Sequence, residues 1–308
     1  MRISHCQRRG ASIHICNLPI YLDSTVILCS VDTVLVTYEA SMTVPSRSLS
    51  KGMARIVAEL ELRQPTLVTV EELTELAQEV GLRTPAKVLA ARLRATGWLL
   101  PTAQRGVYEF APGSHAGPYG HGDPFIDLRA SLRTGHQPIT VALQSALWLH
   151  GLAERAPDRH EVAVPAGTTV SDAIRDRMRV VRFSPRLPPA DVERLPVHQP
   201  PTILVHLATK PGDIRGWHTF AEALPELVSR SSAEDLNREL HQRPSAARAR
   251  LAYLLSGVAP QIADQLQPTR PPTVTWFGAS RTTRRFDKRF NIADDLLPFD
   301  PRTISEAA

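Results

Sequence analysis

Residues 69–98 read TVEELTELAQEVGLRTPAKVLAARLRATGW and contain the two helices on which the fold prediction rests. The segment opens with Thr69 and Glu72, which have the spacing of a capping box, in which each side chain bonds a backbone amide of the other residue. The first helix should end at Gly81, because glycine favours the left-handed conformation that closes helices. Thr84-Pro85 then predicts the start of the second helix, with Thr as the N-cap and proline at the first helical position.

The residues on either side of this segment complete a small domain. Apolar residues recur at helical spacing from Leu49 until Pro65, which predicts a preceding helix. Residues 98–101 and 107–110 have strand-like composition and are separated by the polar turn 102–106, which indicates a hairpin. Three helices followed by a hairpin is the order of a winged helix-turn-helix, and we expect this domain at residues 45–112.

A larger domain of a different kind is expected after a linker. Glycine and proline crowd residues 113–123, as in linkers. Residues 124–300 then mix predicted helices and strands without an internal repeat. Helices are expected near 125–132, 142–152, 217–229, 232–242 and 245–257, strands near 161–164, 180–183 and 273–277, and either a strand or a buried helix at 203–207. The predicted fold class is mixed α/β, an N-terminal winged helix-turn-helix domain plus a larger mixed α/β C-terminal domain.

Residues 1–41 differ from the rest in composition, and two interpretations of them stay open. In the first, translation starts at Met42 or at another downstream position. In the second, residues 25–28 and 33–38 form strands of an N-terminal β-arm. The three cysteines all lie within the first 29 residues of this segment, so the folded body is expected to use no disulfide and no cysteine-bound metal. A secretory signal and a membrane span are not expected, and we predict a cytoplasmic protein.

The positive charge of the chain is concentrated locally. The net charge is +5, and residues 81–108 contain cations and no acid, whereas the preceding helix is acidic. Within the helix that follows Pro85, Lys87, Ala90, Ala91 and Arg94 are predicted to share one face, while Ala86, Leu89 and Leu93 point to the core. The hairpin turn should present Gln104 and Arg105 at its tip. The predicted DNA-binding residues are Arg83, Lys87, Arg92, Arg94, Gln104 and Arg105.

A second basic run lies near the C-terminus, with aromatic residues interleaved. Its cations are Arg281, Arg284, Arg285, Lys288 and Arg289. This pattern indicates a second nucleic-acid surface or a docking site for an acidic protein. The alternative is that the aromatic residues pack inward and the arginines are merely solvated.

Several stretches resemble one protein family. Residues 92–99, leading into 105–113, together with SALWLHGL at 145–152 and HEVAVP at 160–165, resemble the AbiEi family of antitoxins and transcriptional regulators of bacterial type IV toxin–antitoxin systems. The likeness is good over residues 49–165 and loose from there to about residue 300. The resemblance implies a winged domain that binds double-stranded operator DNA and represses its own operon. It also implies a C-terminal domain that counteracts a nucleotidyltransferase-like toxin, which the antitoxin need not bind directly.

The family's groove-reading and wing positions correspond here to Lys87, Arg92, Arg94 and Arg105. The chain is expected to be a monomer in solution or to pair on DNA, since an operator of repeated half-sites would bring two copies together. Residues that carry the antitoxin activity are not predicted.

No catalytic signature, metal site or cofactor site is predicted. His160-Glu161 begins like a zinc-protease helix but lacks the second histidine, and a nuclease-like Glu-x-Lys is missing because residue 163 is Ala. His150 is expected to cap a helix end. The chain is therefore predicted not to be an enzyme. Two alternatives stay open, a nucleic-acid-processing enzyme and a protein–protein adaptor whose winged domain does not bind DNA.

Overall fold

The computed structural model describes residues 21–22, 25–28, 36–38, 47–115, 122–135, 138–278 and 283–304. The chain divides into two compact units, Met1–Ser48 and Leu49–Ala308. In the first unit, β1 (Tyr21–Leu22), β2 (Thr25–Leu28) and β3 (Val36–Tyr38) form an antiparallel sheet. Strands β2 and β3 lie at the two strand-like stretches of the sequence. The rest of the predicted 1–41 extension lies outside the described residues, and its translation start stays a prediction.

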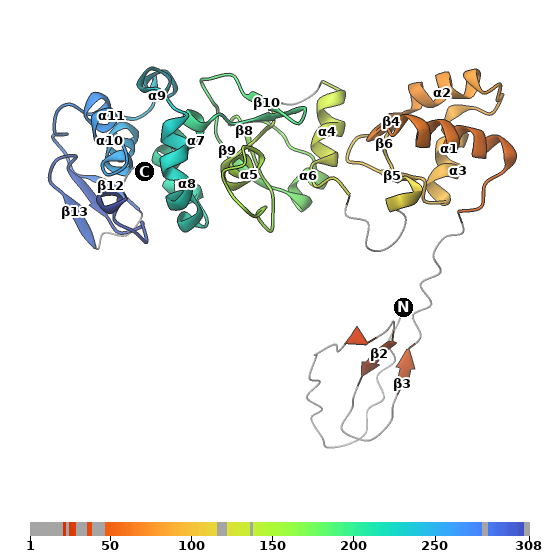
Figure 1. The fold of residues 1–308 in the computed structure, drawn as a ribbon, viewed down its shortest axis with the longest axis horizontal. Helices are drawn as coiled ribbons and strands as arrows, with labels where there is room; N and C mark the ends of the chain where they lie inside the picture. The colour runs from red at the N-terminus through yellow and green to blue at the C-terminus, as the bar shows by residue number, and fades with distance from the viewer. Residues whose placement is uncertain are drawn as a thin grey trace. The chain divides into compact units, whose positions relative to one another are not determined.

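The second unit begins with a helical module at residues 49–112. Its elements are α1 (Lys51–Arg63), β4 (Leu67–Thr69), α2 (Val70–Glu79), α3 (Ala86–Ala95), β5 (Leu99–Pro101) and β6 (Val107–Phe110), seen in orange and yellow in Figure 1. The three helices and the hairpin are present where they were predicted. Strand β4, which was not predicted, pairs antiparallel with β6 and gives the sheet order β4-β6-β5. At three residues β4 is too short to show a strand period.

The predicted start is confirmed for α2 and is wrong by one residue for α3. The capping box before α2 is confirmed, with Glu72 N donating to Thr69 Oγ1 at 3.2 Å and Thr69 N donating to Glu72 Oε2 at 2.8 Å. The N-cap of α3 is Pro85, not Thr84, and no side chain caps it. Proline serves here because its extended ψ of 138° aims its carbonyl at the amide of Leu89, which donates to it at 3.1 Å.

The remainder of the second unit is built on a five-stranded mixed sheet. Its strand order is β10-β11-β7-β8-β9, with β11/β7 and β8/β9 parallel and the other pairs antiparallel. The bounds of these strands are Thr140–Val141 for β7, Glu161–Val164 for β8, Arg179–Arg182 for β9, Ala190–Val192 for β10 and Leu195–Val197 for β11. A second sheet has the order β12-β14-β13, with β12 at Thr275–Phe277, β13 at Arg285–Asp287 and β14 at Ile292–Asp294.

The other helices of the second unit are interspersed with these strands along the chain. They are α4 (Ile126–Arg133), α5 (Leu143–Leu149), α6 (Asp172–Arg177), α7 (Pro200–Thr209), α8 (Trp217–Ser229), α9 (Ala233–Leu240), α10 (Ser245–Leu255) and α11 (Pro260–Leu266), with short 3-10 turns at Gly113–His115, Pro211–Asp213 and Pro301–Thr303. The mixed α/β fold class is therefore confirmed. The boundaries proposed for the individual domains stay predictions.

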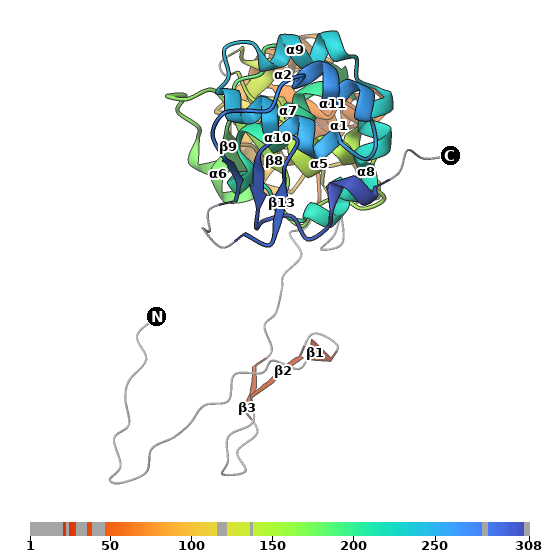
Figure 2. The same cartoon turned by 90° about the vertical axis from the view of Figure 1, so that its left-hand side faces the viewer.

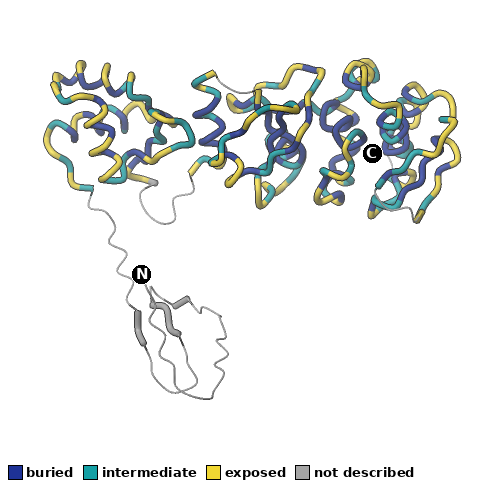
Figure 3. Tube along the Cα trace, turned by 180° about the vertical axis from the view of Figure 1, so that it is seen from behind, coloured by how far each residue is buried: buried dark blue, intermediate teal, exposed yellow. Residues whose placement is uncertain are grey.

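The segment at 203–207 is part of a buried helix. Every residue of α7 from Pro201 to Ala208 is buried, and α7 packs against α9 and α10 (Figures 1 and 2). Because α7 is buried all round, its sequence has no polar stripe from which to tell it from a strand. Buried and exposed positions instead alternate along the helices of the 49–112 module (Figure 3). Among the helices that the structure describes, none combines the length and the apolar character needed to cross a membrane.

Two histidines are buried where α7 meets the five-stranded sheet. His198 and His206 are both 0% exposed, and Phe183 stacks on His206 with ring centroids 4.0 Å apart. His198 Nε2 lies 3.0 Å from Thr140 Oγ1, and His206 Nε2 lies 3.8 Å from Asp213 Oδ2. Burial lowers the pKa of both imidazoles, and for His198 the nearby His206 and Arg243 lower the pKa further.

We expect these imidazoles to make the protein less stable in mild acid. Their pKa lies below 6.5 when folded and near 6.5 when unfolded, so at lower pH the unfolded state binds more protons. The free energy of unfolding should therefore fall as pH drops below about 6.5, by up to about 1.4 kcal/mol per pH unit for each imidazole. Urea unfolding as a function of pH measures this slope. His198→Gln should make the free energy of unfolding depend less on pH, whereas His218→Gln, at an exposed position of α8, should not. Equal slopes in both variants would contradict the assignment of the pH dependence to the buried imidazoles.

Candidate nucleic-acid interface

The basic face of α3 is largely where it was predicted. Lys87, Arg92 and Arg94 are exposed, as is Arg83 in the loop before the helix. Ala86, Leu89 and Leu93 are buried and form part of the core of the module, as predicted.

One residue of the predicted face was assigned wrongly. Ala90 is 1% exposed and belongs to the core, so it does not line a groove-facing surface. It lies one turn after Ala86, which places both methyl groups on the buried side. The exposed face is instead centred on Ala91, which shares it with Lys87 and Arg94 at i−4 and i+3.

No carboxylate in the described part of the chain pairs with the cations of this face. Among the ion pairs between described residues, none joins an acid to Arg83, Lys87, Arg92, Arg94 or Arg105. Two acids of α2 pair elsewhere, Glu79 with Arg63 of α1 at 2.5 Å and Glu72 with Arg133 of α4. The positive charge that follows α2 is therefore available to a phosphate.

The turn at residues 102–106, here called the wing turn, is closely held. Thr102 Oγ1 donates to Val107 O at 2.9 Å, and Val70 N at the start of α2 donates to Gly106 O at 3.1 Å. Gly106 has φ +82°, a conformation that glycine adopts without strain. Arg105 is exposed at the tip and Gln104 is half-buried.

A cation–π contact joins the wing to α3. Arg94 Cζ lies 5.9 Å from the centroid of the Tyr108 ring on β6, within the range of such contacts. This contact places Arg94 beside the hairpin that carries Arg105.

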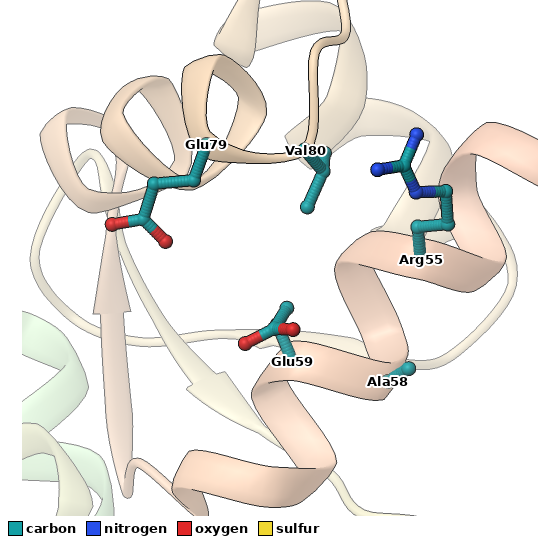
Figure 4. Close-up of a pocket in the computed structure, with 5 residues that line it drawn as sticks. All are labelled: Arg55, Ala58, Glu59, Glu79 and Val80. Atoms are coloured by element: carbon teal, nitrogen blue, oxygen red, sulfur yellow. The ribbon is translucent and has the colours of Figure 1, made fainter.

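A hollow of about 280 Å³ lies on the same module, between α1 and the end of α2. It is lined by Arg55, Ala58, Glu59, Glu79 and Val80, and Figure 4 shows both carboxylates bordering it. None of the predicted DNA-binding residues lines the hollow, so it is not part of the predicted interface.

Two cations of the second basic run form ion pairs in the structure. Arg281 lies outside the described residues. Arg285 pairs at 2.8 Å with Asp294, which is 0% exposed, and Arg289 pairs with Asp264. Arg284 and Lys288 are exposed, and of the aromatic residues Phe277 and Phe290 are fully buried. Arg285 is therefore committed to a buried carboxylate, whereas Arg289 pairs with Asp264 at the surface.

The motifs weighed for catalysis have structural partners. Glu161, 3% exposed at the start of β8, pairs with Arg179 of β9 at 2.5 Å and accepts from Gln144 N at 2.8 Å. Burial raises the pKa of this carboxyl. His160 packs on Phe125 with ring centroids 4.5 Å apart, and burial lowers the pKa of its imidazole.

His150 is the C-cap of α5, as expected, and its Nε2 lies 2.8 Å from the carbonyl oxygen of His198. Within the described part of the chain, no three histidine, cysteine or acidic residues come together in a way that could hold a metal ion.

Asp127 is a residue of this region that the sequence did not indicate. Its Oδ1 accepts a hydrogen bond from Ala103 N of the wing turn at 2.6 Å. In the sequence it is an acid in the first turn of a helix, a position that the helix dipole alone explains. Nothing in its spacing points to a residue 24 positions earlier.

Comparison with known proteins relates most of the second unit to proteins already described. A family model described as the AbiEi antitoxin C-terminal domain matches residues 139–257, which run from just before β7 to just after α10. The crystal structure of the RV2827C protein from Mycobacterium tuberculosis is similar, with a TM-score of 0.70 and 27% sequence identity. The similarity covers 83% of this chain and 96% of that one. No curated protein matches the chain.

Proposed function

We propose that this protein is the antitoxin of a type IV toxin–antitoxin pair, because residues 139–257 match the family model of the AbiEi antitoxin C-terminal domain, as the resemblance predicted. It represses its own operon through the 49–112 module, acting as a winged helix-turn-helix, and counteracts a nucleotidyltransferase-like toxin through the C-terminal domain. Both actions take place in the cytoplasm. Direct binding of the toxin is not required by this proposal.

The observation that carries the DNA-binding half is the set of exposed cations without carboxylate partners in the described structure, on α3 and the wing turn. In this assignment α3 lies in the major groove with Lys87 and Arg94 directed toward base edges or phosphates. Arg83, Arg92 and Arg105 contact the phosphate backbone, and Gln104 lies beside the groove. The chain is a monomer in solution or pairs on an operator with repeated half-sites.

We propose further that the protein is not an enzyme and uses no cofactor. The acid that most resembled a nuclease carboxylate, Glu161, is buried and committed to Arg179 and to the amide of Gln144. A carboxylate held in this way already has its charge balanced, which supports a structural role.

Titration of the full chain with its own promoter region tests the DNA-binding half. The observed association constant should fall linearly with salt on a log–log scale, because bound cations release counterions from the duplex. The duplex should stay intact when Mg²⁺ is added. Absence of duplex binding would favour the adaptor alternative, and Mg²⁺-dependent cleavage would favour the nuclease. A gene for a nucleotidyltransferase-like protein beside this one would support the antitoxin half.

A further inference from the structure

The wing turn is connected to the C-terminal part of the chain by one buried carboxylate. Asp127, on α4, is 1% exposed, and its Oδ1 accepts from Ala103 N at 2.6 Å. Ala103 is two residues before Arg105, so this hydrogen bond fixes the backbone immediately beside the exposed cation of the turn.

The carboxylate itself is held from the other side. Arg177 Nη1, at the end of α6, lies 2.9 Å from Asp127 Oδ2. A buried charge is tolerated when it is paired, and here Oδ1 accepts the hydrogen bond from Ala103 N while Oδ2 lies in the ion pair with Arg177. Asp127 therefore links the wing turn to α4 and α6.

Apolar contacts support the same arrangement. Leu67 of β4 and Val107 of β6 form a small buried cluster with Ile126 and Ala130 of α4. Arg133, at the end of α4, pairs with Glu72 and donates to Leu67 O at 3.1 Å. The sheet of the 49–112 module thus packs against α4, and Asp127 is the residue of α4 that hydrogen-bonds to the wing turn.

We propose that Asp127 is a positioning residue for DNA binding: it holds the wing turn so that Arg105 and the cations of α3 meet the same duplex. The inference rests on the proposed DNA binding of the module. It makes the orientation of the wing depend on the C-terminal domain, which the sequence of the module alone does not reveal.

The test compares Asp127→Ala with Arg105→Ala, and with both together, in the full chain on a mixed-sequence duplex of two helical turns. Each single variant should weaken binding and reduce the salt slope by about 0.9, the contribution of one phosphate contact. The double variant should lose no more than one contact, because both changes remove the same interaction. Removing a negative charge would by itself strengthen binding to DNA, so a weaker Asp127→Ala complex is not a charge effect.

Three controls separate positioning from folding. Asp127→Asn keeps the Oδ1 acceptor and should restore the wild-type slope. Asp172→Ala removes an acid whose side chain is 87% exposed on α6 and should leave the slope unchanged. Hydrogen exchange of the Ala103 amide should be slow in the wild type and in Asp127→Asn, and fast in Asp127→Ala. If Asp127→Ala does not fold, Asp127→Leu fills the same space without an acceptor.

A wild-type slope in Asp127→Ala or Asp127→Leu, or additive losses in the double variant, would overturn the inference. Failure of the wild-type chain to bind the duplex, or no effect of Arg105→Ala, would instead refute the proposed function. Exchange of the Ala103 amide would still report on the contact in that case.

Discussion

Replacing Lys87, Arg92, Arg94 and Arg105 together with glutamine should flatten the salt dependence of DNA binding. Each lost phosphate contact lowers the slope of log K against log salt by about 0.9, so the four together should lower it by about 3 to 4. The four side chains are exposed and have no carboxylate partner among the described ion pairs, so the fold should tolerate the change. Binding isotherms over a range of salt concentrations measure the slope.

A matched variant separates a local interface from the general attraction of a basic protein to DNA. Arg155, Arg186, Arg194 and Lys210 are also exposed, and they lie outside the 49–112 module. Neutralising them changes the net charge equally, so any long-range effect of charge should be the same. We expect the slope of log K against log salt for this control variant to stay near that of the wild type. An equal loss of slope in both variants would refute the assignment of the interface to α3 and the wing turn.

The elements that were predicted correctly are those specified by neighbouring residues. The capping box of Thr69 and Glu72 is complete within four residues, and the core positions Leu89 and Leu93 follow from helical spacing alone. Ala90 shows the limit of that spacing. Whether a helix position at the edge of the buried face is itself buried depends on the residues that pack against it. A small side chain such as alanine does not indicate by its own chemistry whether it is buried or exposed.

Contacts between distant segments could not be predicted in this way. Asp127 and Ala103, or Arg285 and Asp294, meet only because separate elements fold against one another. For this reason the sequence placed Arg285 and Arg289 in an unpaired basic surface, although both pair with acids in the structure. Strands of two or three residues, such as β7 and β10, are set by pairing with neighbours and leave no period in the sequence.

Glu239→Ala should destabilise the C-terminal part of the chain more than a typical surface change. Glu239, on α9, is 0% exposed and pairs with Arg243, whose side chain is 10% exposed. Its carboxylate also accepts from the amides of Arg186 at 2.9 Å and Leu187 at 3.0 Å, and from Thr202 Oγ1 at 3.1 Å. Removing it leaves the charge of Arg243 without a carboxylate, since its remaining acceptors are the backbone oxygens of Ser184 and Glu239, and leaves two backbone amides without their acceptor.

Breaking a buried pair of this kind costs about 3 to 5 kcal/mol, because the remaining charge stays desolvated and unpaired. Glu234→Ala is the matched control on the same helix. Glu234 pairs with Arg238 at 2.8 Å, but its side chain is 83% exposed, and such a pair contributes about 0.5 kcal/mol or less. Urea unfolding followed by circular dichroism gives both free energies, provided that the dependence on urea is unchanged. Glu239→Gln, which keeps an acceptor oxygen, should fall between the two; a cost for Glu239→Ala no greater than for Glu234→Ala would show that Arg243 and the amides find other partners.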